Sequence, residues 1–200
     1  MSPALPKMPL MRASFMQSNV AELGQLGNDA EARVRDAVGE EALEIVSNAA
    51  RTAWLPLQHN VDLVRHVTAV VGERRRDDWF RSSMHRSLRT PLLEPLRKAA
   101  FRVFGVSPGA LFRAMPSGWN AVYRNVGSVK HRAMPNAASV TLSALPALLF
   151  EAPGYIEGLC GTFGALLDVA ETAGTVELIS LSKRRRSAAF EIRWGRALAV

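Results

Sequence analysis

The stretch Ser187-Ala-Ala-Phe-Glu-Ile-Arg-Trp194 decides the fold class, because its side chains alternate with a period of two residues. Apolar side chains at every second position share one face of an extended chain, and the more polar side chains share the other. This alternation predicts a β-strand with one face buried. The predicted inward positions are Ala188, Phe190, Ile192 and Trp194.

Three further strands and one helix precede this strand. Alternating patterns predict strands at Ser128–Met134, Ala138–Leu145 and Thr175–Ser182. Between the second and third of these, apolar residues at helical spacing predict a helix over Pro153–Ala173. Residues 128–194 are therefore expected to form a strand-strand-helix-strand-strand module with an antiparallel sheet.

The predicted helix of this module also carries a stripe of small residues. Glycine inside a helix costs up to about 1 kcal/mol relative to alanine, so several glycines together need a reason. We expect this face of the helix to approach a sheet or another helix closely. The small residues are Gly154, Gly158, Gly161 and Ala165.

The residues before the module predict about six helices. Asn28 and Asn60 are expected to be N-caps, and Gly72 is expected to end the helix that Asn60 begins. Ser107 followed by proline predicts the start of the last of these helices, which is expected to end at Gly127.

The chain of 200 residues is long enough for one domain with a two-layer core. We expect a flexible leader over residues 1–9 and a single α+β domain over residues 10–196. The helical part is expected over about 28–127, with Leu10–Phe15 as a short strand or extended lead-in.

The composition is that of a soluble globular protein, with 48% hydrophobic and 22% charged residues. A single cysteine excludes an intramolecular disulfide, and no apolar stretch has the length of a membrane span or signal peptide. These features predict a cytoplasmic protein. The formal net charge of +7 permits an acidic partner without requiring one.

Motifs of known enzymes are absent from the sequence, which contains neither Gly-x-Ser-x-Gly nor Gly-Lys-Ser/Thr. The histidines do not have the spacing of a metal-binding motif, so no metal site is predicted. We therefore expect a protein that is not an enzyme and that carries no cofactor. The four histidines are His59, His66, His85 and His131.

Lys183-Arg184-Arg185-Arg186 lies in the turn between the last two predicted strands, with no adjacent acidic residue. Basic hairpins can bind phosphate backbones, so these four residues are the alternative site, for nucleic acid or an anionic surface. No signature of a nucleic-acid-binding fold accompanies them, and a solvated turn is the favoured interpretation.

Cys160 lies on the predicted helix of the module, among apolar residues and glycines. A reactive thiol requires nearby positive charge or a helix N-terminus, and neither is evident here. A buried structural cysteine is the favoured interpretation, and an acylated cysteine is the alternative.

The arrangement of a helical half followed by this module resembles the haem-nitric-oxide-binding and four-vinyl-reductase-type superfamily. More closely, the sequence is similar to an uncharacterised family known mainly from myxobacteria. Three segments carry the resemblance: Phe104–Gly127, Tyr155-Ile156-Glu157-Gly158, and Phe190-Glu191-Ile192-Arg193-Trp194.

The resemblance implies a ligand-sensing or protein-interaction domain with an apolar pocket between helices and sheet. It implies a small apolar ligand or a protein partner. Independently of the resemblance, a homodimer is among the expected assemblies. No haem is expected, because the Tyr-x-Ser-x-Arg motif of haem-binding members is missing, and the last hairpin has no cysteine for a metal. The expected pocket residues are Phe112, Trp119, Leu142, Cys160, Phe163 and Phe190.

Overall fold

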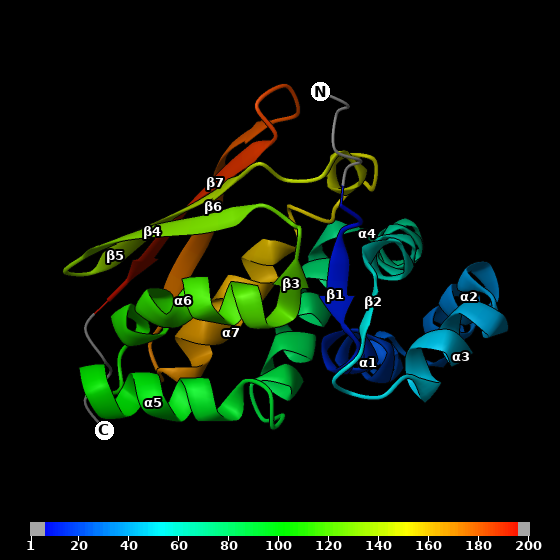
Figure 1. Ribbon diagram of the computed structural model, residues 1–200, viewed down its shortest axis with the longest axis horizontal. Coiled ribbons are helices and arrows are strands. Elements are labelled where there is room, and N and C mark those ends of the chain that lie inside the picture. Colours follow the sequence, from blue (N-terminus) through cyan, green and yellow to red (C-terminus); the bar gives the residue numbers. More distant parts are fainter. Residues whose placement is uncertain (1–6, 196–200) are drawn as a thin grey trace.

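The computed structural model describes residues 7–195 and has an α+β architecture, as the sequence predicted. Most helices come from the N-terminal half, and a four-stranded antiparallel sheet comes from the C-terminal part (Figure 1). Of the predicted leader, residues 1–6 lie outside the described residues, as does residue 196 of the predicted domain. Among the described residues, no helix is long and apolar enough to cross a membrane.

The large sheet consists of the four predicted strands. Its spatial order is β4-β5-β7-β6, with every neighbouring pair antiparallel. Strands β4 and β7 have the predicted bounds, and β5 and β6 differ from the prediction by one or two residues at their ends. The strands are β4 (Ser128–Met134), β5 (Ala137–Ser143), β6 (Gly174–Ser182) and β7 (Ser187–Trp194).

One face of this sheet packs against helices and forms much of the core. The helices α6 (Pro108–Val122) and α7 (Leu159–Val169) lie on that face, with α5 (Glu94–Phe104) beyond them (Figure 1). The Phe163 ring of α7 meets the Phe190 ring of β7 edge-on, at 5.0 Å between centroids. Apolar side chains at alternate positions of β5 and β7 are almost fully buried, as the period of two predicts: Ala138, Val140, Leu142, Ala188, Phe190 and Ile192.

The structure also contains a second sheet of three strands, which the sequence did not predict. Its order is β2-β1-β3, which joins segments far apart in the chain. The prediction that the helix after Ser107 ends at Gly127 is wrong, because α6 ends at Val122 and the chain then enters β3. Strands of two or three residues are too short to show an alternation. The strands are β1 (Leu10–Arg12), β2 (Trp54–Pro56) and β3 (Tyr123–Arg124).

The helical part begins earlier than predicted. The helix α1 (Ala13–Ala21) precedes the expected start at Asn28 and is followed by a 3-10 helix, Glu22–Leu26. Seven of the nine residues of α1 are buried, polar ones included, so the helix shows no amphipathic stripe in the sequence. The helices α2 (Asn28–Val38) and α3 (Glu40–Asn48) follow.

Both asparagines predicted as N-caps are helical residues instead. Gly27, with φ 81° and ψ 153°, is the residue before α2, and the Asn28 side chain makes no capping bond. The helix α4 (Leu57–Ser87) begins three residues before Asn60, whose side chain is buried. Gly72 lies where the sequence predicts a helix end, and its backbone (φ 75°, ψ 177°) leaves the helical conformation within α4. This conformation is accessible almost only to glycine.

The predicted start of the helix after Ser107 is correct. Helix α5 begins at Glu94, and Ser107 caps α6 by accepting a hydrogen bond from the Ala110 backbone N–H at 3.2 Å. Pro116 lies inside α6 without ending it.

Helix α7 is shorter than the predicted Pro153–Ala173, because turns occupy the residues before Leu159. The close approach expected from its small residues is present, and the partner is α4. A Cβ atom on Gly161 would lie 2.0 Å from the Asp77 carbonyl oxygen, and one on Gly158 would lie 2.3 Å from the Phe80 ring.

Candidate ligand cavity

An apolar cavity of about 90 Å³ lies among the helices. Its walls come from α1, α4, α5, α6 and α7, with one residue each from β1 and β3. Most of the lining residues are almost fully buried. The partly exposed ones are Met84, Leu96, Arg97, Ala114, Gly118 and Thr162. Apolar residues that contribute to the walls include Met11, Phe15, Phe80, Met115 and Leu166.

Small residues on α6 explain why space remains between these helices. Ala114 and Gly118 are one helical turn apart and both line the cavity. A Cβ atom on Gly118 would lie 3.5 Å from Leu96 of α5, so the two helices approach closely at this level. The short side chains of Ala114 and Gly118 leave space that larger side chains at these positions would occupy.

A chain of buried polar side chains borders the cavity. The Asn19 side-chain amide donates to Asn60 Oδ1 at 2.7 Å, and the Asn60 amide donates to the Tyr155 hydroxyl at 3.0 Å. The Tyr155 and Tyr123 hydroxyls are 3.4 Å apart. Burial raises the pKa of both tyrosines, well above the usual value for Tyr123. Asn19, Asn60 and Tyr123 line the cavity and are buried, so part of its border is polar and neutral.

Three polar atoms of lining residues are buried without a hydrogen-bond partner among the described residues. They are Asn19 Oδ1, Trp119 Nε1 and Arg97 Nε. A buried donor or acceptor left unpaired costs about 1–3 kcal/mol. A hydrogen-bond partner for these atoms would recover that free energy.

The structure distributes the predicted pocket residues between two places. Trp119 and Phe163 line the cavity. Phe112, Leu142 and Phe190 do not; they are at most 1% exposed and lie in the core of the sheet module. The cavity therefore lies among the helices, whereas the sequence predicted a pocket between helices and sheet.

Cys160 lies on α7 but does not line the cavity. Its thiol is partly buried, and burial together with the nearby Asp77 carboxylate raises its pKa to about 11. A thiol with this pKa is almost entirely protonated at neutral pH, which disfavours nucleophilic chemistry.

The polar cavity residues were not identified from the sequence. Arg97 follows the pattern of an exposed helical position, and Asn60 has the pattern of an N-cap. The places of these residues in the cavity wall depend on how the helices pack. A single sequence does not show that packing, and its one signal is that asparagines occur among apolar residues.

The four basic residues Lys183–Arg186 form the exposed turn between β6 and β7, as predicted. Arg186 is fixed to the protein, because its Nε donates to the Leu145 carbonyl oxygen at 2.6 Å. Among the described residues, no carboxylate forms an ion pair with Lys183, Arg184 or Arg185.

The described histidines contribute nothing to the cavity lining. His59 and His66 line a separate depression between α3 and α4, and His85 Nε2 is 2.8 Å from Asp168 Oδ2. His131 is on β4. Within residues 7–195, no three His, Cys, Asp or Glu side chains are grouped so that they could hold a metal ion.

The fold is that of H-NOX domains. The Fe(II) unliganded H-NOX protein from K. algicida has a TM-score of 0.63 at 10% identity, over 95% of this chain and 100% of that one. A variant of Tt H-NOX gives 0.59 at 12% identity, over 95% and 98%. An oxygen-binding H-NOX domain related to soluble guanylate cyclases gives 0.58 at 9% identity, over 94% and 96%. No protein-family model matches the sequence, and no curated protein does.

The cavity of this chain does not fit the haem that the fold name implies. Among the described residues, no histidine or cysteine lines it, and the hydroxyl of its one lining tyrosine, Tyr123, is buried beside Tyr155. Its volume of about 90 Å³ is below the roughly 150 Å³ that accommodates benzene, and a porphyrin is several times larger than benzene. The residues present therefore offer neither an axial ligand nor the space for a haem.

Proposed function

We propose that this protein is a non-enzymatic ligand-sensing or adaptor domain, which binds a small, mainly apolar molecule in the cavity among its helices. The observation that supports this function is the cavity itself, because its walls are apolar and three buried polar atoms of its lining have no partner among the described residues. Concave apolar sites with a few polar groups are typical of small-molecule binding.

The position of the cavity suggests how binding would be transmitted. Its walls contain residues of α1, of α4 to α6, and of α7, which belongs to the sheet module. A ligand that contacts all of these helices would favour the conformation in which they pack together. A protein partner could then recognise that conformation.

Thermal unfolding with neutral probes tests this function. 1-Propanol and 1-butanol are small enough for the cavity and are expected to raise the unfolding temperature of the wild-type protein, because they bind the folded state only. The Ala114→Leu variant fills the cavity and should abolish this rise. The control is Asn120→Leu, an exposed position on the same helix, which should retain it.

Native mass spectrometry of protein purified from its own host provides a second test. A co-purified small molecule would identify the ligand directly. If none co-purifies and neither probe shifts the unfolding temperature, the proposed ligand-sensing function is wrong.

We further propose that the chain belongs to the myxobacterial-type family that its sequence resembles and acts in the cytoplasm. A homodimer is the proposed assembly. Sedimentation velocity at several protein concentrations would distinguish the dimer from a monomer.

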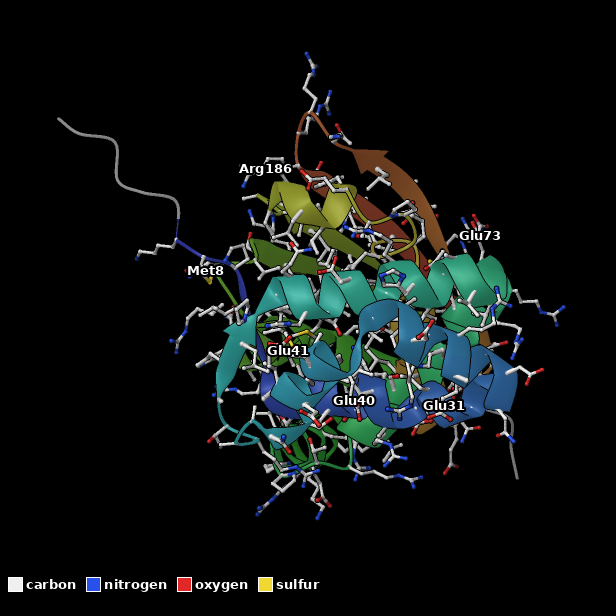
Figure 2. All side chains as sticks on the ribbon, turned by 90° about the vertical axis from the view of Figure 1, so that its right-hand side faces the viewer. Met8, Glu31, Glu40, Glu41, Glu73 and Arg186 are labelled. Atoms are coloured by element: carbon white, nitrogen blue, oxygen red, sulfur yellow. The ribbon has the colours of Figure 1, made fainter. Side chains whose placement is uncertain are left out.

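An alternative function, binding of nucleic acid or another anionic surface, is supported by a separate observation. Lys183, Arg184 and Arg185 are exposed on a turn at the tip of the β6–β7 hairpin, where it projects from the body of the protein (Figure 1). Figure 2 shows Arg186 of this turn at one end of the molecule, away from the acidic residues Glu31, Glu40 and Glu41 of α2 and α3.

Salt dependence tests this alternative. Binding to duplex DNA or RNA should fall steeply between about 50 and 200 mM salt. An R184Q/R185Q variant should bind more weakly, whereas R89Q/R102Q removes the same charge at exposed positions elsewhere and should not. Absence of binding by the wild-type protein at low salt would exclude the alternative.

A further inference from the structure

We infer that the ligand of the helical cavity is a short monocarboxylic acid, whose carboxylate is bound by Arg97 Nε and Trp119 Nε1. This inference rests on the proposed ligand-sensing function and specifies the class of ligand. Two of the unpaired polar atoms of the lining residues are hydrogen-bond donors on neighbouring helices.

Arg97 provides a positive charge among the partly exposed residues of the lining. Its Nε is buried and unpaired, although part of the side chain is exposed. No described carboxylate lies within ion-pair distance of its guanidinium. The acidic residue one turn earlier, Glu94, is paired with Lys98 at 2.8 Å, and that bond is the main reason why the pKa of Glu94 is lowered, with a smaller contribution from Arg97.

Trp119 provides the second donor. Its side chain is 8% exposed, and its indole N–H has no partner among the described residues. An indole nitrogen can only donate, so an acceptor is required to satisfy it. A Cβ atom on Gly118 would lie 3.5 Å from Leu96, so the neighbouring residues Arg97 and Trp119 come from the part of α5 and α6 where the two helices are in contact.

A carboxylate satisfies both donors with its two oxygens. The guanidinium fork is matched to planar oxygen acids, and hydrogen bonds to charged groups are stronger than neutral ones. The remaining lining is apolar, which suits an aliphatic tail and disfavours an ion without one, such as inorganic phosphate. The volume of about 90 Å³ limits the tail to a few carbons.

The third unpaired atom, Asn19 Oδ1, would favour an acid that carries a hydroxyl group on its tail. Asn19 Oδ1 is an acceptor on α1, and Asn19 is 1% exposed. Its own amide is already engaged with Asn60, so the free oxygen is available to the cavity as an acceptor only. A hydroxyl group on the tail of the acid would pair with it.

Binding of butyrate and 1-butanol to the full chain tests the inference, because the two molecules share an apolar tail and differ in charge. We expect butyrate to bind at least about tenfold more tightly, since hydrogen bonds to a charged group contribute more than neutral ones. In proton–nitrogen NMR spectra, butyrate should shift the Trp119 indole signal further than 1-butanol does, because a carboxylate is the stronger acceptor. Trp119→Phe assigns that signal.

Variants of one helix provide the controls. Arg97→Gln should weaken butyrate binding about tenfold or more and weaken 1-butanol binding much less, and the effect of Arg97→Lys on butyrate should lie between those of wild type and Arg97→Gln. Arg102→Gln removes the same charge from an exposed position of α5 and should have no effect. Far-UV circular dichroism of each variant checks that the fold is retained.

The outcomes separate this inference from the proposed function. If 1-butanol binds and butyrate does not bind more tightly, or if Arg97→Gln leaves the preference intact, the carboxylate assignment is wrong while the cavity function stands. Preference for inorganic phosphate over butyrate would also overturn the assignment. If neither butyrate nor 1-butanol binds, the proposed function fails together with it.

Discussion

The Asn60 side-chain amide donates a hydrogen bond to the Tyr155 hydroxyl at 3.0 Å, and both residues are about 1% exposed. This bond joins α4 to the turns before α7 across 95 positions of the chain. It lies in the middle of the polar chain from Asn19 to Tyr123, so it links the wall of the cavity to the sheet module.

Tyr155→Phe is expected to destabilise the protein by about 1–3 kcal/mol, because the buried Asn60 amide loses its acceptor. The control is Tyr123→Phe, which removes only the 3.4 Å contact between the hydroxyls and should cost roughly 0.5 kcal/mol. Urea unfolding of both variants measures the difference. Equal losses would show that the Asn60 bond is not the stabilising one.

The two tyrosines predict a loss of stability at high pH. Burial raises the pKa of Tyr123 and of Tyr155 in the folded state, so the unfolded chain releases their protons at lower pH. Above about pH 10 the unfolded state therefore binds fewer protons than the folded state, and the free energy of unfolding falls as pH rises. Absorbance at 295 nm should show no tyrosinate until the protein unfolds. A titration near pH 10 with the fold intact would contradict this prediction.

Gly161→Ala tests the close approach of α7 to α4. The added Cβ would lie 2.0 Å from the Asp77 carbonyl oxygen, which belongs to backbone and cannot move freely. We expect a loss of about 1–3 kcal/mol in the free energy of unfolding. Gly164→Ala is the matched control on the same helix, because its Cβ would meet only the flexible Arg81 side chain at 3.6 Å. That variant should gain up to about 1 kcal/mol from higher helix propensity.

Cys160 should react slowly with alkylating reagents in the folded protein. Its pKa of about 11, raised mainly by burial, leaves a much smaller thiolate fraction at pH 8 than in an unfolded chain. After allowance for the greater nucleophilicity of a thiolate with a high pKa, we expect iodoacetamide to react about ten- to a hundredfold more slowly than in urea. Mass spectrometry of timed samples measures both rates. Equal rates would show that the thiol is not protected.

The sequence by itself determined the sheet module, because alternation with a period of two in Ser187–Trp194 can bury one face only as a strand. It also predicted the place of the break at Gly72 and the cap at Ser107, which depend on local backbone chemistry. It did not predict α1, whose burial on almost all sides removes the amphipathic pattern.

Only the tertiary structure decided where the cavity lies and which polar atoms face it. Asn19, Asn60 and Arg97 come from segments far apart in the chain. In a differently folded chain, each could form its hydrogen bonds with neighbouring residues or with water. The space among five helices arises from how their small and large side chains meet, and that complementarity depends on distances that periodicity does not specify. The sequence therefore determines which faces are buried, whereas packing determines whether a buried face encloses a ligand site.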